Sequence, residues 1–160
     1  IGVNFTICYL LIALSNGYFD NLIHNLFGIS ANAFTMGRKT IFADLINILG
    51  NPDFFGIGIG NAYSIFALHS NLGEMNIHSD LLKGIYEFGY IGFSIWIFCL
   101  YKFNLLNKKT FFLTLYLNIL FATDNVFIYF HTMFPFYLLQ ANLMLRNNID
   151  YNTLELNKTI

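Results

Sequence analysis

The sequence predicts an all-α, polytopic transmembrane helix bundle of about three to four spans, with a large extracytoplasmic loop that contains short interfacial helices. Hydrophobic residues make up 56% of the 160-residue chain and aromatic residues 19%. Charged residues make up only 11%, far below the roughly 25% that is typical of soluble domains. A lipid bilayer is therefore the expected partner, and no basic patch supports a nucleic-acid partner.

The first apolar run covers residues 1–14. A span needs about 20 residues to cross ~30 Å of hydrocarbon, so we interpret 1–14 as a transmembrane span truncated at its start. Cys8 and Cys99 lie inside apolar runs and lack a Cys-x-x-Cys spacing. Neither a disulfide nor a zinc or redox pair is expected from them.

Residues 15–83 are interpreted as one extracytoplasmic loop. Within it, the apolar residues from Arg38 to Leu49 follow one face of a helix and predict a short interfacial helix that ends before Asn51-Pro52-Asp53. Residues 54–68 are apolar but interrupted by glycines. Irregular backbone at membrane depth must be buried in protein or line a wet cavity, so we expect a re-entrant or amphipathic segment packed against other helices.

Three spans are expected in residues 84–145. The clearest runs from Gly84 to Tyr101 and is flanked by lysines. Residues 110–145 would extend ~54 Å as a single helix, which is far more than the bilayer core. The polar turn formers Thr123-Asp124-Asn125 therefore predict a hairpin of two spans.

The cations set the expected orientation. Lys102, Lys108, Lys109 and Arg146 all fall on one side of these spans, and the positive-inside rule makes that side cytoplasmic. Residues 146–160 would then form a cytoplasmic tail, expected to be disordered because it has little to pack against.

Arg38 is the first candidate for chemistry. A guanidinium binds phosphate through two parallel hydrogen bonds, so next to a bilayer it suits a pyrophosphate head group, and Lys39 could add charge. The alternative is a surface cation attracted to anionic lipid. The Gly56 to Gly60 run lacks the last glycine of a nucleotide-binding loop, because position 61 is Asn, and indicates flexible or close-packed backbone.

His78 is the second candidate, because a neutral imidazole can accept a proton at physiological pH. The alternative is an interfacial histidine bonded to a loop carbonyl. Asp80 could orient His78 or cap a helix before Leu81. His69, Glu74 and His78 match no zinc spacing, so no metal is expected. Asp124 and His131 could line a pathway in the hairpin, although a turn also explains Asp124.

In their order, these motifs resemble those of the O-antigen ligase and Wzy-type O-antigen polymerase superfamily of bacterial membrane glycosyltransferases. Gly37-Arg38 looks like the family's Gly-Arg element, Asn51-Pro52 through Gly60 like its Pro-then-Gly-x-Gly segment, and His78 to Leu82 like its His-x-x-x-Leu element. The chain departs from the family at Ser79, which is often Asn, and at Phe42, near which the family often has Trp.

The resemblance implies an enzyme of the bacterial cytoplasmic membrane that acts on its outer face. The donor would be a glycan on a polyprenyl pyrophosphate, and the acceptor a sugar hydroxyl. His78 would be the base and Arg38 would stabilise the departing pyrophosphate. Gly37, Lys39 and Asp80 would contribute to substrate binding, with no metal or cofactor.

Within the family we favour a polymerase of lipid-linked repeat units of O-antigen or capsular polysaccharide, because the aromatic-rich, motif-poor loop looks more like that of the family's divergent polymerases. The first alternative is a ligase that transfers the glycan to lipid A core or another acceptor. The second is a non-enzymatic polysaccharide transporter or structural subunit. Transporters tend to place charges inside spans and show paired broken helices, whereas the candidate charges here fall in one loop.

Overall fold

A computed structural model describes residues 1–73, 75–102 and 108–156. These residues form helices and loops without any strand, which confirms the all-α class. In chain order the elements are α1 Gly2–Ser15, α2 Asp20–Phe27, α3 Ala31–Phe34, α4 Arg38–Leu49, α5 Asn61–His69, α6 Asp80–Lys102, α7 Lys108–Thr123, the short 3₁₀ helix η1 Val126–Ile128, and α8 Phe130–Leu156.

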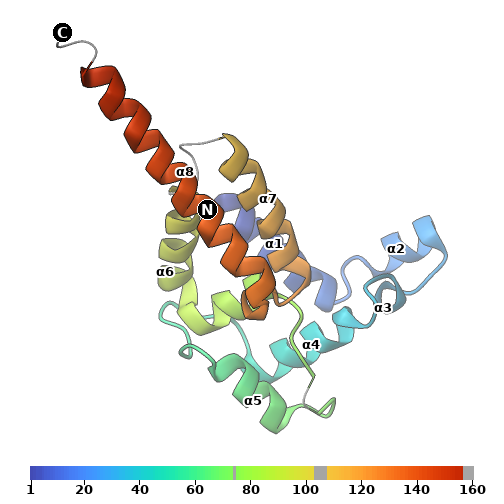
Figure 1. Cartoon of the computed structure of the whole chain (residues 1–160). Helices are drawn as coiled ribbons and strands as arrows, with labels where there is room; N and C mark the ends of the chain where they lie inside the picture. The colour runs from blue at the N-terminus through green and yellow to red at the C-terminus, as the bar shows by residue number, and fades with distance from the viewer. Residues whose placement is uncertain (74, 103–107, 157–160) are drawn as a thin grey trace.

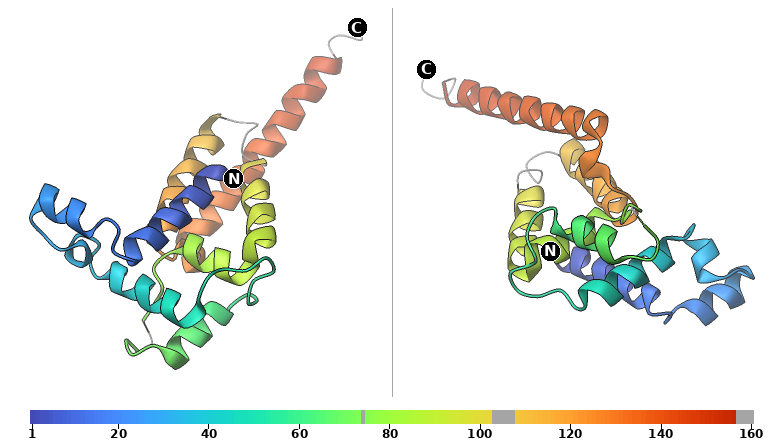
Figure 2. Two further views of the ribbon diagram at one scale, coloured as in Figure 1. Left: turned by 180° about the vertical axis from the view of Figure 1, so that it is seen from behind. Right: turned by 90° about the horizontal axis from the view of Figure 1, so that it is seen from below.

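The helices pack around one apolar core (Figure 1). α1 packs against α4 and α6, α5 packs against the same two helices, and α7 packs against α6. α2 and α3 project to one side of this group, while the last turns of α8 extend away from it (Figures 1 and 2). The largest fully buried apolar side chains are Phe42, Phe66, Phe93, Phe121, Leu45, Ile77, Leu81, Leu82 and Ile97.

Two local predictions are confirmed and one is wrong. α4 has the bounds that its apolar face predicted, and the chain turns after Thr123, where the hairpin was expected. The expected disordered tail is wrong for residues 146–156, because α8 continues through them to Leu156. Residues 157–160 lie outside the described part of the chain.

One helix of the described chain, α6, is by itself long and apolar enough to cross a membrane. α1 and α2 reach that length only together and across a bend of 83°. The apolar part of α7, Thr110–Thr123, is shorter than a span. Three to four spans therefore stay a prediction, and among the described helices α6 alone meets the length and composition of a span without a partner helix.

α6 is not the uninterrupted span that its sequence predicts. Gly89 has φ 64° and ψ −179°, so the helix is broken at this residue. This combination of angles is essentially restricted to glycine. The break releases carbonyl groups on one side of Gly89 and amide groups on the other, and each needs a partner in a buried setting.

The loop between α4 and α5 supplies those partners. The amides of Ile57 and Gly58 donate to the carbonyls of Tyr86 and Glu87 at 3.0 Å each. In return, the amide of Tyr90 donates to the carbonyl of Asp53 at 2.9 Å, and that of Ile91 to the carbonyl of Phe54 at 3.2 Å. The loop thus lies against a helix, as predicted, and completes the backbone hydrogen bonding of the broken α6.

Ser79 fixes the start of α6. Its fully buried hydroxyl accepts from the Leu82 amide at 3.1 Å and donates to the carbonyl of Phe121 at 3.3 Å. We expect Ser79→Ala to lower the free energy of unfolding by about 1 to 2 kcal/mol, because it removes a helix cap and a buried bond to α7. Unfolding in detergent checks this. Ser30→Ala, which removes an exposed cap from the four-residue α3, is the control; an equal loss in both variants would contradict the prediction.

Candidate functional site

Arg38 begins α4 beside two residues in left-handed backbone. Gly37 is the residue before the helix and has φ 85°, and Met36 has φ 53°. Arg38 itself is half-buried, and its guanidinium forms no hydrogen bond or ion pair within the described part of the chain. Its guanidinium is therefore not occupied by another described side chain, and the predicted binding of a pyrophosphate stays a prediction.

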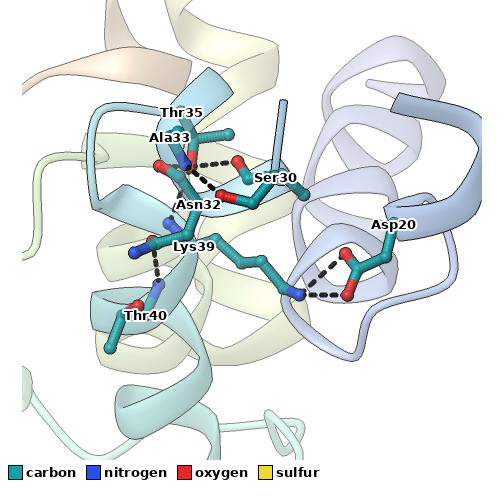
Figure 3. Close-up of polar contacts among 8 residues, drawn as sticks. Asp20, Ser30, Asn32, Ala33, Thr35, Lys39 and Thr40 are labelled. Carbon is teal, nitrogen blue, oxygen red and sulfur yellow. Dashed lines mark hydrogen bonds and ion pairs between the residues drawn. The ribbon is translucent and has the colours of Figure 1, made fainter. Parts of the chain in front are cut away.

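Lys39 is already engaged. Its Nζ lies 2.7 Å and 2.5 Å from the two carboxylate oxygens of Asp20 (Figure 3). The start of α4 is further tied to α3, since the Lys39 amide donates to Thr35 Oγ1 at 3.1 Å and the Thr40 amide to Asn32 Oδ1 at 3.2 Å. Lys39 would have to give up Asp20 to bind a phosphate, so its predicted substrate role has no support in this arrangement.

His78 lies in the segment between α5 and α6 and also has left-handed backbone, with φ 49°. Left-handed backbone is uncommon outside glycine, and at functional sites such strain holds a side chain in place. Nδ1 of His78 is buried and lies 3.6 Å from Oδ1 of Asp124. Because the side chain as a whole is 36% exposed, its accessible part lies away from Nδ1.

The pairing of His78 with Asp124 is held by bonds from the two residues that follow His78. The Ser79 hydroxyl donates to the carbonyl of Phe121, and the Asp80 amide donates to the carbonyl of Asp124 at 3.2 Å. The Asp80 carboxylate accepts from the Phe127 amide at 2.9 Å. The start of α6 is therefore bonded to the turn between α7 and η1, which positions the imidazole against the carboxylate before any ligand binds.

Asp124 is suited to remain charged. Its Oδ1 accepts from the Asn125 amide at 2.8 Å and from the Tyr129 hydroxyl at 3.3 Å. The hydrogen bond from the Asn125 amide is the main cause that lowers the pKa of Asp124, with His78 and Tyr129 adding to the effect. A charged carboxylate at Nδ1 orients an imidazole and stabilises the imidazolium that forms when Nε2 takes a proton.

A cavity of about 240 Å³ lies beside the segments that carry this pair, although His78 and Asp124 are not among its lining residues. Asn76 and Ile77, which precede His78, line it together with Asn125, which follows Asp124. Asn125 is 7% exposed, and its Oδ1 finds no hydrogen-bond partner within the described residues. Lys83 brings a positive charge to the same cavity. Gly60, Tyr63 and Ile128 complete its lining.

The structure brings together only part of the predicted site. Arg38 and His78 share no hydrogen bond or ion pair in the described part of the chain, and neither lines the cavities that Lys83 borders. Asp80 neither orients His78 nor caps α6: its carboxylate is bonded to Phe127, and the cap is Ser79. The interpretation of Asp80 as a cap is therefore wrong by one residue, because the serine hydroxyl reaches the Leu82 amide.

Sequence reasoning weighed Asp124 only as a turn or pathway residue and treated Lys83 as a flank of a span. Nothing local could reveal that Asp124 lies against His78. The available signal was that Asp124 and Asn125 are polar residues of a predicted turn, on the same side of the membrane as a histidine that precedes a predicted span. Of the potential metal ligands, Glu74 lies outside the described residues, and the described residues contain no group of three or more His, Cys, Asp or Glu placed to hold a metal.

Comparison with known proteins adds no family: no protein-family model, no curated protein and no solved structure matches this chain.

Proposed function

We propose that this chain acts in a multi-pass glycosyltransferase of the bacterial cytoplasmic membrane that polymerises lipid-linked repeat units of O-antigen or capsular polysaccharide. The observation that carries the proposal is the close approach of His78 to Asp124, 3.6 Å between Nδ1 and Oδ1, in segments that hydrogen bonds from Ser79 and Asp80 hold together. Sequence neighbours of both residues line a cavity that also contains Lys83. The order of motifs, from Gly37-Arg38 to His78, is the second support. The pair faces the extracytoplasmic side in the orientation that the cations predict.

In this mechanism His78 takes the proton from the acceptor hydroxyl while that oxygen attacks the anomeric carbon of the donor. The bond from the anomeric carbon to the pyrophosphate breaks as the new glycosidic bond forms, so the configuration inverts. Asp124 stabilises the imidazolium. General base catalysis of this kind contributes about 10²- to 10⁴-fold to a rate.

A cation must stabilise the charge that grows on the departing pyrophosphate, a role worth ~3 kcal/mol per well-placed donor in other enzymes. Arg38 is the candidate from the motif order, and its guanidinium is free within the described chain. Lys83 is the candidate from geometry, because it lines the cavity beside the pair. The scheme requires neither a metal nor a cofactor.

A transporter is the competing function, and the broken α6 favours it. Many transporters place discontinuous helices at the substrate site, and here Glu87 is buried next to the break at Gly89. A ligase, which hands the finished glycan to lipid A core or another acceptor, shares the chemistry of the polymerase. It would use the same base and the same leaving group.

Deleting the gene from its native host and separating the glycans by size tests the three functions together. For a polymerase we expect the ladder of repeats to collapse to single repeat units that are still attached to the acceptor. A ligase would instead leave intact polymer on the lipid carrier. A transporter would leave single lipid-linked units on the inner face with nothing attached, and either of these two results would overturn the proposal.

A further inference from the structure

A second cavity, also of about 240 Å³, lies along α6 on the side of the helix break. The two cavities share a single lining residue, Lys83. Ile59, from the loop that completes the break, covers part of it. Its acidic, basic and aromatic lining residues are Asp80, Lys83, Glu87, Phe88, Trp96 and Phe127.

Glu87 gives this cavity an unsatisfied acceptor. Its side chain is 5% exposed, and Oε1 finds no hydrogen-bond partner among the described residues. The nearest cation is Lys83, whose Nζ lies 3.9 Å from Oε1, too far for a hydrogen bond. A buried carboxylate oxygen without a hydrogen bond is costly, so a donor that came within reach of the Glu87 carboxylate would be stabilised there.

Aromatic rings form an apolar surface in the same cavity. Trp96 contacts Phe127 with 5.2 Å between ring centroids and an interplanar angle of 55°. Phe127 is stacked on Phe121 at 4.5 Å and 12°, which fixes its position. Phe88 adds a third ring to the cavity, 6.1 Å from Trp96. The cavity thus offers flat apolar faces together with charged hydrogen-bonding groups.

The charges decide between classes of ligand. An ammonium ion would suit the aromatic rings, but Lys83 places a positive charge in the same space. A phosphate would suit Lys83, but Asp80 and Glu87 place two acidic groups there. A neutral polyhydroxyl ring meets neither conflict: its hydroxyls donate to carboxylates and accept from an ammonium group, and its C–H face packs on aromatic rings.

We infer that this cavity binds a single pyranose ring of the glycan substrate, a subsite that rests on the proposed function and extends it. The volume supports one ring, because it lies below the roughly 300–1,000 Å³ of pockets that enclose drug-sized ligands. Lys83 borders both cavities, so the ring would lie next to the first cavity, which is also lined by Ile77 and Asn125, the neighbours of His78 and Asp124 in sequence. The apolar residues position the ring, and Glu87 selects for its hydroxyls.

The fluorescence of Trp96 reports binding directly, because it is the single tryptophan of the sequence. The protein in detergent is titrated with D-galactose, N-acetylglucosamine and L-rhamnose. Mannitol, which has the hydroxyls without the ring, choline and inorganic phosphate are the comparison probes. We expect a saturable change of emission with at least one pyranose, and none with the comparison probes.

Glu87→Gln is the test of the assigned residue. It should weaken pyranose binding at least about tenfold, because a hydrogen bond to a charged group is lost. Asp20→Asn, which removes the same charge at a residue that does not line the cavity, should leave binding unchanged. If Glu87→Gln does not fold, the unsubstituted protein is tested instead. A bound pyranose should then protect Trp96 from quenching by acrylamide. Absence of saturation and of protection, or an equal response to mannitol, choline or phosphate, would overturn the inference.

The two proposals can fail separately. If deletion of the gene leaves the polymer ladder unchanged but the purified protein binds a pyranose, the proposed polymerase is wrong and the sugar site stands. A ladder that collapses on deletion, combined with no pyranose effect on Trp96, would keep the polymerase and remove this subsite.

Discussion

Gly89→Ala is expected to prevent the chain from folding, or to leave it far less stable than the parent protein. A Cβ atom at this position would lie 2.5 Å from the carbonyl carbon of Phe55 and 2.6 Å from that of Phe54. Both are backbone atoms, which cannot rotate away as a side chain can. The substitution would also place alanine at φ 64° and ψ −179°, angles that L-residues avoid. Steric overlap and backbone strain each cost about 1 to 3 kcal/mol.

Gly50→Ala separates the two causes. Gly50 has φ 71° and ψ −148°, close to the angles of Gly89, but a Cβ there would meet no atom within 4 Å. This control variant therefore carries the backbone strain without the overlap. We expect its apparent melting temperature in detergent to fall moderately, whereas Gly89→Ala should give little monodisperse protein on size-exclusion chromatography. Similar behaviour of the two variants would show that the loop does not dock against the break as described.

Gly56→Ala should reproduce the defect from the loop side. A Cβ on Gly56 would lie 2.6 Å from the carbonyl carbon of Phe88 and even closer to the amide nitrogen of Gly89. Because the two glycines face each other across one contact, their effects should not add in the double variant. The measurement is the same detergent melting experiment. Additive losses would indicate that each glycine is needed for a different reason.

The elements that sequence predicts well here are those with local causes. The apolar face of residues 38–49 defines α4, and the polar turn after Thr123 ends α7. The break in α6 has no such cause: Gly89 lies in an apolar run that reads as a continuous span. Its reason is the backbone of residues 53–58, which is distant in sequence and bonds to both sides of the break.

The residues of the candidate site likewise fall into two groups, those that local sequence predicts and those that tertiary contacts place. His78 was identifiable because a histidine before an apolar run is unusual, and its neighbour Ser79 caps the helix that this run forms. Asp124 lies in the turn that the sequence predicts. Its position against His78 depends on tertiary contacts, which the local sequence does not reveal. The motif order suggested that Arg38 and His78 act together, but order along a chain does not determine distance. Lys83, which the sequence did not single out for chemistry, lines the cavity that Ile77 and Asn125 also line.

His78→Asn is expected to abolish the polymer ladder, with a loss of activity of about 10²- to 10⁴-fold, the contribution of a general base. Asparagine is the informative replacement, because it tolerates the left-handed backbone of His78 at φ 49° better than alanine and cannot accept the proton. The variant is introduced at the native locus, and the glycan ladder is compared at equal protein levels in the membrane. His69→Asn, at the exposed end of α5, is the matched control and should keep a full ladder.

Asp124→Asn then separates a base from an interfacial histidine. If Asp124 orients and stabilises the imidazolium, the variant should shorten the ladder while His78 remains in place, and adding Asp124→Asn to His78→Asn should cause no further loss. When two residues act as one unit, removing either one abolishes their shared contribution, so removing both costs no more activity. If His78 only bonds a loop carbonyl, both single variants should keep a full ladder, and the catalytic reading of the pair would be wrong. A loss in Asp124→Asn with a full ladder in His78→Asn would assign Asp124 to the turn between α7 and η1 alone.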